Sequence, residues 1–303
     1  FDIDETTEME GGKVVLKDGK PTGILIDKIM EKVRDNLPKA SKAELEIAFL
    51  QAQKDCFAVG LTTVSDAGLE KGIIQQIDEM QKSGELKMRI YAMLDATDST
   101  NQSYLKSGPY KTDRLNVCSY KYYSDGALGS RGAYLIEPYS DAPHEHGLMQ
   151  YDSTYLADEA RKCYEAGFQM NTHCIGDGAN RLLLDIYADV LKEKNDRRWR
   201  IEHAQIVHPD DIEKFGQYSI IPSIQTTHAT SDMYWADERL GDERLKSGGY
   251  IYKQLLAQNG FIPNGSDFPV EHINPLYGFY AAVARKDLKG YPDDGFQMEN
   301  ALT

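Results

Sequence analysis

Three residues that could do chemistry hold equivalent positions in the chain. His173, His203 and Asp267 each end or closely follow a short strand-like run, just before a turn. Imidazoles suit zinc and similar divalent metals, and an aspartate can bind a metal or accept a proton from bound water. A lone histidine would more often be structural, and a lone aspartate before a proline could be a turn residue. Their recurrence favours His173 and His203 as metal ligands and Asp267 as a metal ligand and catalytic base.

A lysine occupies a fourth such run. Lys121 lies in an apolar, tyrosine-rich segment, where an inward-facing lysine is costly unless it is paired or neutral. A neutral amine can react with carbon dioxide, and the resulting carbamate could bridge two cations. A salt bridge between Lys121 and Asp125 is the alternative that the residues alone favour.

Three other histidines give weaker signals. His144 and His146 form a His-x-His pair, but a proline precedes them and a glycine follows, so we expect a surface loop. His228 follows another strand-like run. It could equally face the substrate or be structural.

Strands and helices are expected to alternate along the chain. The strand-like runs lie near residues 61, 88, 117, 168, 200, 219 and 261. Helices behind them imply a parallel sheet, and candidate ligands at strand ends suit a (β/α)8 TIM-like barrel in the α/β class. A barrel needs one strand more than these seven, and the chain begins with Phe1. We therefore expect strand 1 to lie upstream.

Composition limits the classes of partner. The chain has 303 residues, 41% of them hydrophobic, enough for one large domain. A net charge of −14 argues against nucleic acid as a partner. No apolar run is long enough to cross a bilayer, so we expect no membrane partner and a soluble, preferably cytoplasmic protein, with export left open. The four cysteines form no CxxC pair, which argues against a zinc knuckle or a disulfide framework.

Five motifs together resemble the amidohydrolase superfamily, amidohydrolase family 3. The similar branch contains N-substituted formamide deformylases and proteins labelled exoenzyme-regulator-like. The motifs, in chain order, are Lys121-Tyr-Tyr-Ser-Asp-Gly-Ala-Leu-Gly-Ser-Arg131, Thr172-His-Cys-Ile-Gly-Asp177, Ile201-Glu-His-Ala-Gln205, Pro222-Ser-Ile-Gln-Thr-Thr-His-Ala-Thr230 and Gly265-Ser-Asp-Phe-Pro269.

The resemblance implies a metal-dependent hydrolase on a distorted barrel, with one or two divalent ions, zinc before others. It implies that Lys121 is carboxylated and bridges two metals, and that His173, His203 and Asp267 are ligands. It also places His228 near the substrate. With His228, we predict two residues of the lysine motif, Asp125 and Arg131, as substrate-binding.

The chain departs from the family pattern at two points. The first-strand His-x-His is absent, and the pair at His144 and His146 follows the lysine in chain order and so cannot replace it. The accessory β-sandwich is absent too. We therefore expect residues 1–303 to be an internal part of a longer protein: one incomplete barrel domain holding strands 2 to 8, with residues 1–40 as its lead-in segment.

The predicted function is hydrolysis of an amide or related C–N bond, of formamide or N-acyl type, in a small molecule. The alternative is a regulatory or ligand-binding barrel of the same fold that has lost catalysis. A metal-dependent phosphatase is weaker, because no cluster of basic residues suggests phosphate recognition. The small-molecule amide is the predicted partner, and a homodimer is the assembly considered.

Overall fold

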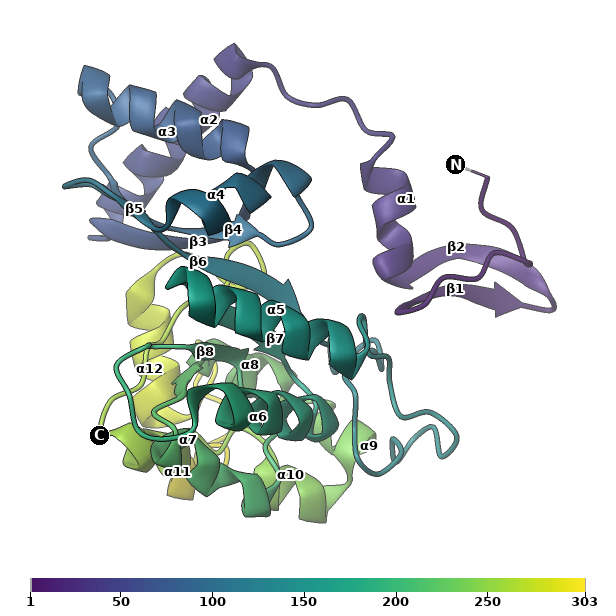
Figure 1. The fold of residues 1–303 in the computed structure, drawn as a ribbon. Helices are drawn as coiled ribbons and strands as arrows, with labels where there is room; N and C mark the ends of the chain where they lie inside the picture. Colours follow the sequence, from purple (N-terminus) through teal and green to yellow (C-terminus); the bar gives the residue numbers. More distant parts are fainter. Residues whose placement is uncertain (1, 303) are drawn as a thin grey trace.

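A parallel sheet forms the centre of the computed structural model, which describes residues 2–302 (Figure 1). Its strands lie in the order β3-β4-β6-β7-β8-β9, and the short β5 pairs antiparallel with β6. Within residues 2–302 the sheet is an open path that starts at β3 and ends at β9. The strands are β3 (Thr63–Leu69), β4 (Arg89–Asp95), β5 (Tyr110–Lys111), β6 (Leu115–Tyr123), β7 (Gln169–Cys174), β8 (Arg200–His203) and β9 (Ile221–Ser223).

The expected alternation of strands and helices is confirmed, whereas closure of an eight-stranded barrel stays a prediction. Of the seven expected strand regions, six form parallel strands, and the region near residue 261 contributes only a bridge between Ile224 and Asn264. Pro263 lacks a backbone N–H, so it cannot donate to a sheet ladder there.

Helices follow most strands and cover the outer face of the sheet. The major ones are α2 (Lys42–Ala58), α3 (Lys71–Ser83), α5 (Ser153–Ala166), α6 (Asp177–Leu191), α11 (Tyr252–Asn259) and α12 (Pro275–Ala284). The shorter ones are α4 (Gln102–Ser107), α7 (Ile212–Gln217), α8 (Thr226–Asp232), α9 (Ala236–Leu240) and α10 (Asp242–Gly248), with 3-10 turns η2 (Ser99–Asn101), η3 (Pro209–Asp211) and η4 (Met298–Asn300). None of the helices within residues 2–302 combines the length and apolar character needed to cross a bilayer.

The core between sheet and helices is apolar and aromatic. Trp199, immediately before β8, is fully buried, and its ring lies edge to face with that of Tyr187 of α6, at 4.8 Å between centroids. The indole Nε1 donates to the carbonyl of Phe168 at 3.0 Å. Side chains along each strand alternate between this core and the inner face of the sheet, where the site lies.

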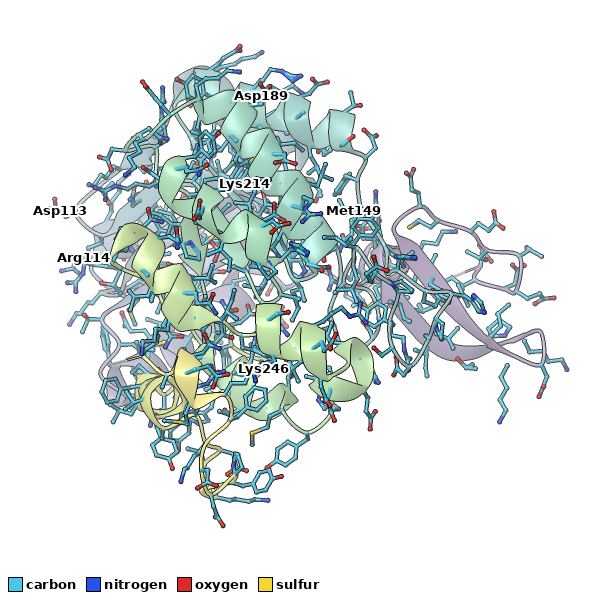
Figure 2. The ribbon with its side chains drawn as sticks, turned by 90° about the horizontal axis from the view of Figure 1, so that it is seen from below. Asp113, Arg114, Met149, Asp189, Lys214 and Lys246 are labelled. Carbon is cyan, nitrogen blue, oxygen red and sulfur yellow. The ribbon has the colours of Figure 1, made fainter. Side chains whose placement is uncertain are left out.

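A two-stranded hairpin projects from the body of the molecule (Figure 1). It consists of β1 (Gly12–Lys17) and β2 (Lys20–Asp27), and it leads into η1 (Lys28–Met30) and α1 (Glu31–Arg34). Figure 2 labels Met149 where this hairpin meets the body. The approach there is close: a Cβ on Gly11 would lie 2.7 Å from the Cα of Gln150.

The sequence pattern predicts one helix over residues 24–37 and another over residues 242–259, and the structure differs from both predictions. The pattern from Ile24 to Leu37 predicts a helix, but β2 runs to Asp27 and only residues 28–34 are helical. Residues 242–259 form two helices because the chain breaks at Gly249, whose backbone is extended. A β carbon there would also lie 2.8 Å from the Leu245 carbonyl oxygen.

Candidate functional site

Parallel pairing brings the strand-end residues into rows on the inner face of the sheet. Asn171 of β7 pairs with Lys121 of β6 on one side and with Arg200 of β8 on the other. One step further along, His173 pairs with Glu202. Residues two apart on a strand share a face, so Lys121 and His173 belong to one polar surface. Residues that lie dozens of positions apart in the sequence are thereby placed on neighbouring strands.

The two predicted histidine ligands are in contact. The rings of His173 and His203 lie edge to face, with 4.6 Å between their centroids. Burial lowers the pKa of His173 to about 3 and holds the pKa of His203 well below its usual value. Both imidazoles are therefore neutral at physiological pH, the form in which histidine binds metals.

Hydrogen bonds orient both imidazoles. Nδ1 of His203 lies 2.7 Å from Oε1 of Gln225, an oxygen that only accepts, so Nδ1 carries the proton and Nε2 keeps its lone pair. Nε2 of His173 lies 3.4 Å from the carbonyl oxygen of Gly126 and 3.4 Å from Oδ1 of Asp125. These acceptors favour a proton on Nε2, which leaves the lone pair of His173 on Nδ1.

Lys121 is buried next to these rings. Its side chain forms no ion pair among residues 2–302, so the alternative of a salt bridge between Lys121 and Asp125 is not observed. Its Nζ lies over the ring of Tyr123, 4.4 Å from the centroid. Burial lowers the pKa of Lys121, while the nearby Glu202 and Asp267 oppose this shift.

Asp267 and His228 approach the same surface from later parts of the chain. Asp267 stands in a loop with φ of 52° and keeps contact with solvent. Partial burial raises its pKa, and Lys121 opposes that shift. His228 lies on α8 with its ring stacked at 6.1 Å from that of His203, and its buried Nε2 has no hydrogen-bond partner in the described chain.

Two further predicted residues are engaged by the protein itself. Asp125 is fully buried and accepts backbone N–H groups of Tyr134, Ile175 and Gly176 at 2.9, 3.0 and 2.8 Å. Burial raises its pKa to about 7. Arg131 donates to both carboxylate oxygens of Asp141. The substrate contacts predicted for Asp125 and Arg131 stay predictions.

The set of donors is chemically suited to a divalent metal, although no complete group of standard ligands is present. Across residues 2–302, no three histidine, cysteine, aspartate or glutamate side chains converge to hold a metal ion. Two adjacent neutral imidazoles and a buried lysine of lowered pKa are what the chain brings together. The pair at His144 and His146 lies on a loop, as expected.

Sequence reasoning missed two residues of this region. Gln225, the partner of His203, lies in the motif of residues 222–230, in which the sequence predicts only His228 as a site residue. Asp27, at the end of β2, reaches the loop that follows β6. No pattern in the polar N-terminal segment pointed to it.

Comparison with known proteins identifies the family. The protein-family model described as "Amidohydrolase family" matches residues 1–303 of this chain. The chain belongs to the amidohydrolase family. This confirms the resemblance drawn from the five motifs and places the chain in a superfamily of metal-dependent hydrolases.

Individual relatives support the assignment. YtcJ of Bacillus subtilis is 32% identical over 293 residues, covering 94% of this chain and 54% of its own. The N-substituted formamide deformylase of Arthrobacter pascens is 23% identical over 327 residues, covering 98% of this chain and 57% of its own. A metal-dependent hydrolase of uncharacterized function from Pyrococcus horikoshii has a TM-score of 0.78 at 26% identity, covering 95% of this chain and 58% of its own. The chain thus spans little more than half the length of these relatives.

Proposed function

We propose that the protein hydrolyses an amide or related C–N bond, of formamide or N-acyl type, in a small molecule. The observation that carries the proposal is the contact between the neutral imidazoles of His173 and His203. Their ring centroids lie 4.6 Å apart, beside the buried Lys121. The name of the Arthrobacter pascens relative, N-substituted formamide deformylase, supports the choice of bond.

His173, His203, Lys121 and Asp267 would hold one or two divalent ions, zinc before others. Neutral imidazoles offer lone pairs to a borderline metal, and a lysine of lowered pKa is available for conversion to a carbamate. A bound divalent ion lowers the pKa of water and polarises a substrate carbonyl. Two imidazoles with fixed tautomers would then need no reorganisation when the ion binds.

Asp267 is the proposed proton carrier. Its carboxyl lies close enough to Lys121 for each to shift the pKa of the other, and it keeps contact with solvent. A carboxylate in this position can take a proton from the attacking water and give it to the leaving amine. Nε2 of His228 is buried and has no hydrogen-bond partner within residues 2–302, so it could hydrogen-bond the substrate.

A ligand-binding barrel without catalysis is the second candidate. It is favoured by the lack, within residues 2–302, of three converging histidine, cysteine or acidic ligands. Such a protein would bind small molecules on the same inner face but turn none over.

The test uses the full-length protein, its zinc content and the release of amine from a panel of N-substituted formamides and N-acyl amines. We expect about one or two zinc ions per chain, and loss of hydrolysis in His173→Ala and Asp267→Ala. His144→Ala, on an exposed loop, is the matched control and should keep both zinc and activity. Wild-type turnover in either site variant with metal present would exclude the assignment. A zinc-free, inactive wild type would favour the second candidate.

A further inference from the structure

One residue outside the predicted site combines two unfavourable features. Asp27 ends β2 with φ of 57° and ψ of −131°, a backbone conformation that a residue with a side chain rarely adopts. Its Oδ2 is buried and has no hydrogen-bond partner within residues 2–302. Each feature costs free energy in the folded protein. Such costs in one residue are typical of positions held for function.

Two glycines make room for this carboxylate. A Cβ on Gly126 would lie 2.2 Å from Oδ2 of Asp27, and so would one on Gly132. Neither glycine has a positive φ, so close approach and not backbone conformation excludes larger residues here. The hairpin thereby places an acidic group directly against the loop that follows β6.

That loop belongs to the candidate site. The carbonyl oxygen of Gly126 lies 3.4 Å from Nε2 of His173, so a single residue separates Asp27 from a predicted ligand. The preceding residue, Asp125, has three backbone N–H donors to balance its carboxyl. Asp27 has no comparable donors among residues 2–302, so no group of the described chain balances a negative charge on it.

The cations nearest in sequence are engaged elsewhere. Nζ of Lys28 lies 4.1 Å from the centre of the Tyr151 ring and contacts the carbonyl of Gln150. Arg131, beside Gly132, is paired with Asp141. The carboxylate of Asp27 forms no ion pair within the described residues. A bound ligand with a positive charge would therefore give this carboxylate the partner that residues 2–302 do not provide.

We propose that Asp27 binds an alkylammonium group on the amine half of the substrate, and so determines specificity. This role in substrate recognition rests on the proposed amide hydrolysis. The amine that such hydrolysis releases would itself be protonated at neutral pH. The partly buried position strengthens a charge-assisted hydrogen bond relative to one in water. The hairpin would thus bring a recognition group to the site from outside the sheet.

The experiment measures binding, which does not depend on turnover. Benzylamine, protonated at neutral pH, and benzyl alcohol are titrated calorimetrically into the full-length, metal-loaded protein and two variants. Asp27→Asn keeps the shape of the side chain and removes its charge. Asp18→Asn, at the exposed turn of the same hairpin, makes the same charge change away from the site.

We expect wild type and Asp18→Asn to prefer the ammonium by about tenfold or more, and Asp27→Asn to lose that preference. Circular dichroism verifies that both variants are folded. An equal preference in all three proteins, or none in wild type, would overturn the proposal. If Asp27→Asn behaves like wild type while His173→Ala abolishes hydrolysis, only the ammonium site is wrong. A preserved ammonium preference without any hydrolysis would instead count against the proposed function alone.

Discussion

Nδ1 of His203 lies 2.7 Å from Oε1 of Gln225, and both residues are buried. A strand end and the residue that precedes α8 are joined by this hydrogen bond. It fixes the tautomer of the histidine, so Gln225 acts on the site through His203 and not on a substrate directly.

Gln225→Leu should therefore weaken metal binding by about 10–100-fold, since partners of metal-binding histidines typically have effects of this size. Zinc affinity measured against a chelator of known strength checks this. Gln254→Leu, on the exposed side of α11, is the control and should bind zinc like wild type. An unchanged zinc affinity in Gln225→Leu would mean that the tautomer of His203 does not matter.

The histidine pair should act as one unit. We expect His173→Ala and His203→Ala each to reduce kcat/KM by at least about a hundredfold, and the double variant to lose little more than either single one. The reason is that the rings are in contact and either loss removes the same site. Steady-state kinetics on all three variants decides the matter. Losses that multiply in the double variant would show two independent roles.

His228 should make stability depend on pH. Burial lowers its pKa to about 4 in the folded protein, against 6.5 for the free group. Between these values the unfolded chain binds a proton that the folded protein does not, so stability falls as pH decreases from 6.5 to 4. The full difference is about 3 kcal/mol. Urea unfolding across this range measures how the free energy of unfolding changes with pH. In His228→Gln this slope should be smaller than in wild type, by the equivalent of about one bound proton. Identical slopes in both proteins would contradict the shift.

Gly176 should tolerate no side chain. A Cβ there would lie 2.0 Å from the carbonyl oxygen of Tyr134, so Gly176→Ala must displace the backbone next to the donors of Asp125. We expect a loss of about 2–4 kcal/mol in the free energy of unfolding. Gly72→Ala, in α3 with open space around its Cβ, should instead gain about 0.5–1 kcal/mol. Denaturant unfolding of both variants measures the contrast, and equal effects would refute it.

The sequence by itself determined the order of elements and the candidate ligands. Strand-like runs followed by helical patterns are local signals, and they placed His173, His203 and Lys121 at or near the ends of the strands that now carry them. The sequence Ser41-Lys-Ala-Glu44 has the pattern of a capping box, which predicts a helix start, and α2 does begin there. Motifs of a few residues were enough for the family, because side chains that do chemistry leave local patterns.

Tertiary structure alone decided which groups meet. Parallel register set His173 against Glu202, and packing brought the ring of His203 to that of His173. The contact of Asp27 with the loop at Gly126 joins segments about a hundred residues apart, and no local pattern encodes such a contact. Hydrogen bonding of Gln225 to His203 was hidden for the same reason. Periodicity reports which face a residue occupies, but only the folded chain shows what lies opposite.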